Sequence, residues 1–152
     1  MKLLITTIGL FIMISGFTCQ LENDLTPEAS VESKLLTSAP WKRVAATGQR
    51  EGQAVEETWS NQLPCVKDNL YIFLANGKYA SDEGPSKCFP EDPQYESKTN
   101  WSISEDGKIL FIIESEDLGG MEFPYQIVEL TATSLKLQRV LDKLTFTESY
   151  SH

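Results

Sequence analysis

The stretch from Cys65 to Cys88 constrains the fold most, because it reads as one β-hairpin with a cysteine at each end. Asn76-Gly77 lies at its centre, and this dipeptide is the strongest short-range hairpin signal, since both residues tolerate the positive φ of a tight turn. The predicted strands are residues 70–74 and 78–82. A two-residue turn pairs residues whose numbers sum to 153, whereas a three-residue turn with a bulge at Gly77 shifts the register by one.

The two cysteines obey the first of these rules themselves, so we expect them to face each other across the hairpin and to form a disulfide. Directly opposed antiparallel residues supply the Cα separation of ~4.4–6.8 Å that a disulfide needs. Two buried free thiols are the alternative. Evidence for export favours the disulfide, because disulfides persist in oxidising compartments.

The N-terminal segment carries that evidence. Lys2 precedes the apolar run 3–17, which is typical of a signal peptide and shorter than the ~20 residues of a membrane-spanning helix. The run ends in Ser15-Gly16-Phe17-Thr18-Cys19-Gln20, which resembles the lipobox of bacterial lipoproteins. The resemblance implies that a signal peptide, residues 1–18, is removed and that Cys19 is lipidated. Ordinary signal cleavage is the alternative, although no Ala-x-Ala pattern is present.

The rest of the chain divides into a polar tether, residues 19–30, and one domain, residues 31–152. A net charge of −9 argues against nucleic acid as a partner, because phosphate binding needs clustered Lys and Arg. The single histidine is His152, which excludes Ser-His-Asp and Cys-His catalysis and imidazole metal ligation inside the fold. We therefore expect no enzymatic activity, no cofactor and no metal.

A short helix is predicted to lead into the first strand. Thr26-Pro27-Glu28 offers an N-cap, a proline at the first helical position and an acid in the first turn. The helix continues through about Leu36, and Pro40 prevents it from going further. Val31 and Leu35, at i and i+4, are expected to face the rest of the fold.

The remainder of the chain alternates short apolar strands with tight turns. The turn Glu105-Asp106-Gly107-Lys108 repeats the chemistry of the first hairpin, and its pairs sum to 213. Trp101 then lies opposite Ile112, and Ile103 lies opposite Leu110 on the same apolar face. The other predicted strands are residues 41–47, 53–59, 95–104, 108–115, 123–130, 135–141 and 144–150.

A further hairpin is predicted to turn at residues 131–134, where paired numbers sum to 265. An apolar face results on one side of this hairpin, while opposite charges meet on the other. The predicted pairs are Leu130–Leu135 and Val128–Leu137 on the apolar face and Glu129–Lys136 on the other face.

Eight or nine short strands joined by tight hairpins predict an all-β fold. The expected architecture is an up-and-down antiparallel β-barrel of about eight strands with a short N-terminal helix, because closure removes the exposed edges of an open sheet. A sandwich is the alternative.

The sequence also resembles the lipocalin-like domain of small lipoproteins of Gram-negative bacteria. The resemblance covers nearly the whole mature chain and implies a lipid-anchored protein of the bacterial cell envelope, at the outer membrane, whose barrel binds a small apolar ligand. It is carried by the lipobox, Trp41-Lys42, Leu63-Pro64-Cys65, Phe73, Ala75-Asn76-Gly77-Lys78-Tyr79, Asp82-Glu83-Gly84, Lys87-Cys88, Trp101, Asp106-Gly107-Lys108 and Ile127-Val128-Glu129-Leu130.

Four residues are the candidate ligand-binding residues: Tyr71, Phe73, Ala80 and Trp101. In the 153 register Phe73 lies opposite the small Ala80, so this face leaves room if it looks inward. An eight-stranded barrel is just wide enough to be filled by side chains or to hold one small ligand, and ordinary core packing is the alternative for each residue. The expected partners are a small apolar ligand and, through the N-terminal lipid, the membrane. A protein held by the loops, such as a basic host enzyme, is the alternative, and a purely structural accessory protein is the third option.

Overall fold

The computed structural model describes residues 29–113 and 120–152, so Cys19, most of the predicted tether and the predicted helix start at Thr26 lie outside the described residues. In chain order the elements are α1 (Val31–Leu36), β1 (Trp41–Arg50), β2 (Glu56–Glu57), α2 (Pro64–Lys67), β3 (Leu70–Phe73), β4 (Lys78–Asp82), β5 (Tyr95–Ile103), β6 (Ile109–Ile113), β7 (Glu122–Leu130), β8 (Ser134–Leu141) and β9 (Leu144–Ser151).

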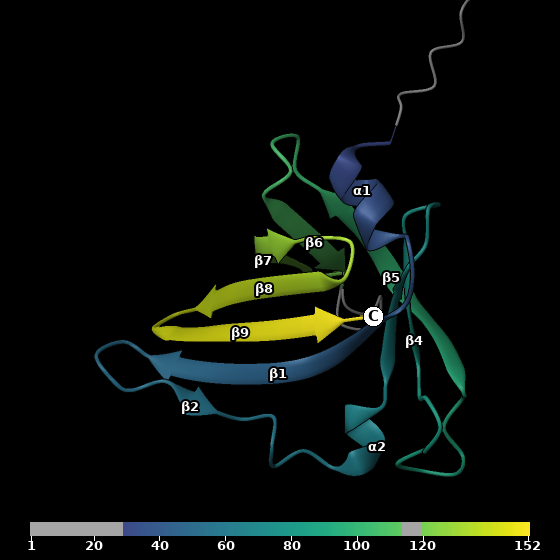
Figure 1. Ribbon diagram of the computed structural model, residues 1–152, viewed down its shortest axis with the longest axis horizontal. Helices are drawn as coiled ribbons and strands as arrows, with labels where there is room; N and C mark the ends of the chain where they lie inside the picture. Colours follow the sequence, from purple (N-terminus) through teal and green to yellow (C-terminus); the bar gives the residue numbers. More distant parts are fainter. Residues whose placement is uncertain (1–28, 114–119) are drawn as a thin grey trace, which may run out of the picture.

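Eight of these strands form a closed antiparallel barrel. Each strand pairs with its neighbour in the order β1-β3-β4-β5-β6-β7-β8-β9, and β9 returns to pair with β1. Figure 1 shows β1, β8 and β9 running across the direction of β4 and β5, as the two sides of a strongly twisted barrel do. The up-and-down barrel predicted from the sequence is therefore confirmed. The strand predicted over residues 53–59 is reduced to β2, which only extends the edge of β1.

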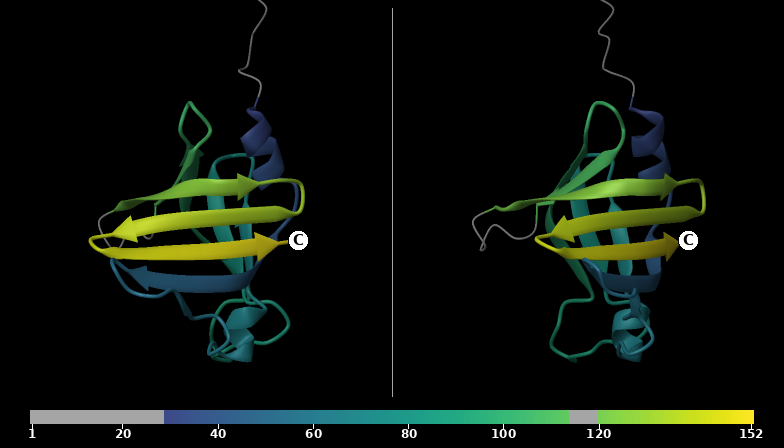
Figure 2. Two further views of the ribbon diagram at one scale, coloured as in Figure 1. Left: turned by 60° about the vertical axis from the view of Figure 1, so that its left-hand side comes forward. Right: turned by 90° about the vertical axis from the view of Figure 1, so that its left-hand side faces the viewer.

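Helix α1 covers the end of the barrel at which β1 begins and β9 ends (Figure 2). Ser30 caps it by accepting a hydrogen bond from the Ser33 N–H at 3.1 Å. Leu36 and Trp41 are fully buried, and the Trp41 indole donates to the Leu36 carbonyl at 2.9 Å. The expectation that Val31 faces the fold is wrong, since it is 66% exposed. The helix has six residues, and its C-terminal end is what reaches the core.

The interior next to α1 is a packed apolar core. Alternate residues of the strands point inward, as the two-residue period of a strand requires. Neither helix in the described residues is long and apolar enough to cross a membrane. The buried cluster consists of Leu36, Trp41, Phe73, Trp101, Leu110, Ile112, Leu135, Leu137 and Tyr150.

The hairpin β3–β4 has the register of the three-residue turn with a bulge at Gly77, which is the second of the two predicted registers. Phe73 lies opposite Tyr79, and Tyr71 lies opposite Ser81, so paired numbers sum to 152 and the 153 register is wrong. The Leu74 N–H donates to the Lys78 carbonyl, and the Gly77 N–H donates to the Leu74 carbonyl. Gly77 has φ +78°, which is the bulge position of a three-residue loop.

The register predicted for the hairpin β5–β6 is confirmed, and the register predicted for β7–β8 is correct for two of its three pairs. Trp101 faces Ile112 and Ile103 faces Leu110, as expected. In β7–β8 a bulge changes the register between Ile127 and Glu129, so Ile127 rather than Val128 lies opposite Leu137. Val128 consequently points outward and is 50% exposed. The pairs Leu130–Leu135 and Glu129–Lys136 are confirmed.

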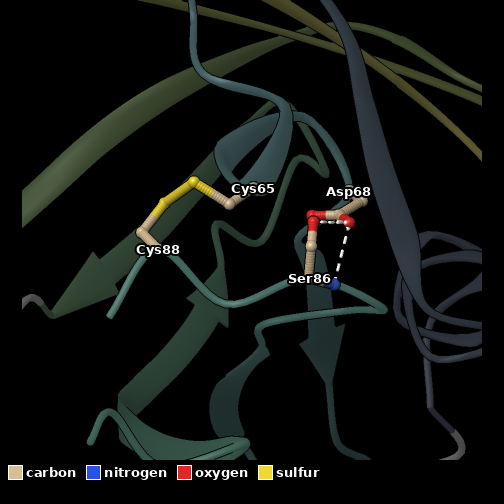
Figure 3. Close-up of a disulfide and its surroundings, with 4 residues drawn as sticks. All are labelled: Cys65, Asp68, Ser86 and Cys88. Carbon is tan, nitrogen blue, oxygen red and sulfur yellow. Dashed lines mark hydrogen bonds between the residues drawn. A yellow bond between two sulfur atoms is a disulfide. The ribbon is translucent and has the colours of Figure 1, made fainter. Parts of the chain in front are cut away.

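The disulfide between Cys65 and Cys88 is present, with the two Cα atoms 5.2 Å apart. The cysteines are not opposed strand residues, however, because Cys65 lies in α2 and Cys88 lies in the loop after β4. Figure 3 shows a second link beside it, in which Asp68 accepts a hydrogen bond from the Ser86 N–H at 3.1 Å. Together these links fasten α2 to the loop between β4 and β5.

Candidate functional site

The barrel contains a cavity of about 1180 Å³ that opens to solvent. This volume lies just above the range of roughly 300–1,000 Å³ that is typical of ligand pockets. Its wall combines aromatic rings, a few aliphatic side chains and an unusual number of charged groups. The aromatic residues are Tyr71, Tyr79, Tyr125, Phe146 and Tyr150, and the charged residues are Arg43, Lys78, Glu83, Glu96, Arg139 and Glu148.

Strand alternation brings three of these charged residues inside the barrel. Arg43 follows Trp41 by two residues on β1, and Arg139 follows Leu137 by two residues on β8. Glu148 precedes Tyr150 by two residues on β9 in the same way. Because residues i and i+2 share a face of a strand, each charge lies on the same inward face as a buried core residue.

Arg43, Glu148 and Tyr150 form a closed hydrogen-bonded group on the wall made by β1 and β9. Nη2 of Arg43 lies 3.0 Å from Oε1 of Glu148, and the two side chains are 21% and 23% exposed. The Tyr150 hydroxyl donates to Oε2 of Glu148 at 2.8 Å and accepts from Nη2 of Arg43 at 3.4 Å. Arg43 therefore has its charge balanced within the protein.

Three aromatic rings surround the guanidinium of Arg43. Its central carbon lies 5.0 Å from the ring centre of Tyr71 and 5.5 Å from those of Tyr150 and Trp59. Burial acts to lower the pKa of Arg43, but Tyr150, Tyr71 and Glu148 oppose it and the net effect raises the pKa. The guanidinium is thus a fixed cation packed among three aromatic rings.

Arg139 has a different environment on β8. Its Nη1 donates to the Tyr125 hydroxyl at 3.3 Å, and its guanidinium carbon lies 4.9 Å from the ring centre of Phe123 and 5.5 Å from that of Tyr125. Among the described residues no carboxylate lies within ion-pair distance of Arg139. Within the described part of the chain the two arginines of the cavity therefore differ, because Arg43 has a carboxylate partner and Arg139 has none.

Burial favours the neutral form of three tyrosines of the cavity: Tyr71, Tyr79 and Tyr150. Burial raises the pKa of Tyr79 and of Tyr150 well above the ordinary value, and it raises the pKa of Tyr71 in the same direction. For Tyr150 the neighbouring Glu148 carboxylate adds to the effect of burial. At neutral pH these phenols are hydrogen-bond donors as well as acceptors.

Two buried polar atoms of the cavity wall have no hydrogen-bond partner among the described residues: Nε of Arg43 and Oγ1 of Thr99. Thr99 is only 7% exposed. More than about 90% of buried polar groups in proteins are satisfied, so these two atoms are exceptions within the wall of the barrel.

The structure separates the four candidate ligand-binding residues. Only Tyr71 lines the cavity. Phe73 and Trp101 belong to the packed core, where their ring centres lie 5.6 Å apart. Ala80 is fully buried but pairs with Ile72, so the expectation that it faces Phe73 is wrong because of the one-residue register shift.

The sequence reasoning missed Arg43, Arg139, Glu148 and Thr99. The available signal was the period-two pattern, since the first three charges lie in phase with Trp41, Leu137 and Tyr150 on their strands. A charge in phase with core residues is unusual, because buried charges are retained when they are paired or functional.

Within residues 29–113 and 120–152 no group of three or more His, Cys, Asp or Glu side chains could hold a metal ion. Comparisons with models of known protein families, with curated proteins and with solved structures give no match. The function is therefore argued from the chemistry of the cavity.

Proposed function

We propose that this chain is a small-molecule-binding protein of the bacterial cell envelope, anchored by a lipid on Cys19, whose barrel holds one ligand in its interior. The observation that carries the proposal is the cavity of about 1180 Å³ inside a closed barrel. Packed protein interiors contain few voids larger than a water molecule, so a space of this size is not explained by imperfect packing.

The division of the barrel interior supports this reading. One end is filled by core side chains and covered by α1, while the cavity occupies the remaining interior and opens to solvent.

The wall also bears on the kind of ligand. The sequence resemblance implies a small apolar ligand, and Ile112, Leu137 and Phe146 provide an apolar surface for such a molecule. The arginines, glutamates and phenols around them favour a ligand that has polar groups as well. An amphipathic molecule matches both parts of the wall.

The test is native mass spectrometry of the full chain purified from the membrane of a Gram-negative host. We expect a co-purifying small molecule. In Thr99→Trp, which places a large side chain in the cavity, the molecule should be lost, whereas Ser102→Trp on the outer face of the same strand should retain it. Circular dichroism establishes that both variants fold.

The contrary outcome is that neither the wild-type chain nor the variants carry a small molecule, while a stoichiometric protein partner co-purifies and is still bound in Thr99→Trp. That outcome would favour the protein-binding alternative over this proposal.

A further inference from the structure

One wall of the cavity carries a positive charge that no carboxylate of the described residues balances. Arg43 is neutralised by Glu148 at 3.0 Å, but Arg139 contacts only a phenol and two aromatic rings among the described residues. A half-buried guanidinium offers five N–H donors in a planar fork that matches a carboxylate. Tyr125 uses one of its donors, so others remain for a ligand.

The other carboxylates of the cavity do not fill this role. Glu83 follows β4, and Glu96 lies in β5. In the closed order of eight strands β4 is opposite β8, and β5 is three strands away from it, so these acids lie on the far wall from Arg139. Glu148 is on the neighbouring strand, but Arg43 and the Tyr150 hydroxyl occupy both of its oxygens.

Arg139 also lies next to the apolar part of the wall. Phe146 is its direct partner across β8–β9, and Leu137 is the preceding inward residue of its own strand. A molecule whose anionic group meets Arg139 would therefore lay its apolar body against these two side chains.

From these observations we infer that the cavity selects an amphipathic monoanion, with a carboxylate or similar oxyanion held by Arg139 and an apolar body against Leu137 and Phe146. This inference rests on the proposed function and names the ligand class of the same site. Charge recognition falls to Arg139, because Arg43 is already neutralised by Glu148.

The experiment compares two ligands that differ only in charge, 2-naphthoate and 2-naphthamide, by isothermal titration into the full chain in non-ionic detergent, with titration into detergent alone subtracted. Naphthoate should bind at least tenfold more tightly than naphthamide, which is the scale of one charge-assisted hydrogen bond. Octanoate and octanamide, titrated in the same way, distinguish an aliphatic from an aromatic body.

The decisive variant is Arg139→Gln. Naphthoate affinity should fall about tenfold, to that of naphthamide, whose own affinity should stay within about twofold. Lys136→Gln is the matched control, because it removes one positive charge from the outer face of the same strand and should change neither affinity. Arg139→Lys, which keeps the charge, should keep most of the preference and provides the test if Arg139→Gln does not fold.

Three results would overturn the inference. Equal affinity of the wild-type chain for acid and amide, or an acid preference that survives Arg139→Gln, would remove it and leave the proposed function standing. Failure of all four compounds to bind would also remove the inference, whereas the proposed function is decided separately by the native mass spectrometry described above.

Discussion

Arg43 forms its ion pair diagonally across β1 and β9, with Glu148 rather than with a directly opposed residue. The residue opposite Arg43 is Tyr150, and the residue opposite Glu148 is Ala46. A β-bulge at Val44 separates the two registers. Glu148 and Tyr150 share the inward face of β9, so a carboxylate, a guanidinium and a phenol meet in one group where the packed core gives way to the cavity.

The pair should contribute to stability because both partners are largely shielded from water. In Glu148→Gln we expect the free energy of unfolding to fall by about 2 kcal/mol, since the guanidinium loses its counter-charge. The double variant Arg43→Met/Glu148→Met should recover most of this loss, because no unpaired charge is left. Urea denaturation measures both.

The exposed pair Lys143–Glu51 is the natural control for that measurement, with side chains 69% and 72% exposed. Surface ion pairs contribute about 0–1 kcal/mol, so Glu51→Gln should change stability by less than about 1 kcal/mol. Equal losses in Glu51→Gln and Glu148→Gln would show that the cavity does not shield the Arg43–Glu148 pair.

The buried tyrosines predict loss of stability in alkali. The pKa values of Tyr71, Tyr79 and Tyr150 are raised in the folded chain, chiefly by burial. Above pH ~10 the unfolded chain loses these protons while the folded chain keeps them. The unfolded state then binds fewer protons, so the free energy of unfolding falls as pH rises, whereas below pH ~10 the contribution is fully present.

Each such tyrosine should lower the free energy of unfolding by about 1.4 kcal/mol per pH unit between pH ~10 and its folded pKa. Denaturation curves at several alkaline pH values give this slope, and Tyr79→Phe should make it shallower. Tyr95→Phe, on a side chain that is 47% exposed, is the control. A slope that Tyr79→Phe does not change would contradict the burial of this phenol.

Gly84 makes the closest backbone approach in the disulfide-linked region. It has φ +70°, and a Cβ at this position would lie 2.3 Å from the Asp68 carbonyl oxygen. We expect Gly84→Ala to lower the free energy of unfolding by about 3 kcal/mol, because backbone strain and a clash with backbone add together.

Gly52 separates the two contributions. It has φ +77° and no atom within 4 Å of its added Cβ, so Gly52→Ala should cost only the ~1 kcal/mol of the left-handed conformation. Thermal unfolding of the two variants gives the comparison, and equal destabilisation would mean that the loop around Gly84 moves away from Asp68.

Strand periods and turn chemistry were enough to predict the barrel, but not its registers. The pair Trp101–Ile112 followed from its turn, because one register satisfied both the turn and the apolar face. Asn76-Gly77 suits a two-residue turn and a three-residue loop equally, so sequence left two registers open and tertiary pairing selected one.

The cavity was harder to predict than the fold, and bulges explain part of the difference. Val44 and Val128 are apolar and look like inward residues, yet both lie at bulges and are 48% and 50% exposed. A bulge arises from pairing between strands and reverses the in-and-out phase beyond it. The inward position of Arg43 is set before the first bulge, and for that reason its phase with Trp41 was readable.

The last prediction concerns attachment to the membrane, which the sequence alone supports. A hydrophobic leader that ends in Cys19 motivates it. In a Gram-negative host the chain should be recovered from the membrane fraction and should incorporate labelled fatty acid. Cys19→Ala should abolish the label and should either release the chain or leave its leader uncleaved. The double variant Cys65→Ala/Cys88→Ala is the control, because it removes the two disulfide cysteines and should keep the label. Unchanged labelling, processing and membrane recovery of Cys19→Ala would show that another segment or ordinary signal cleavage determines where the chain resides.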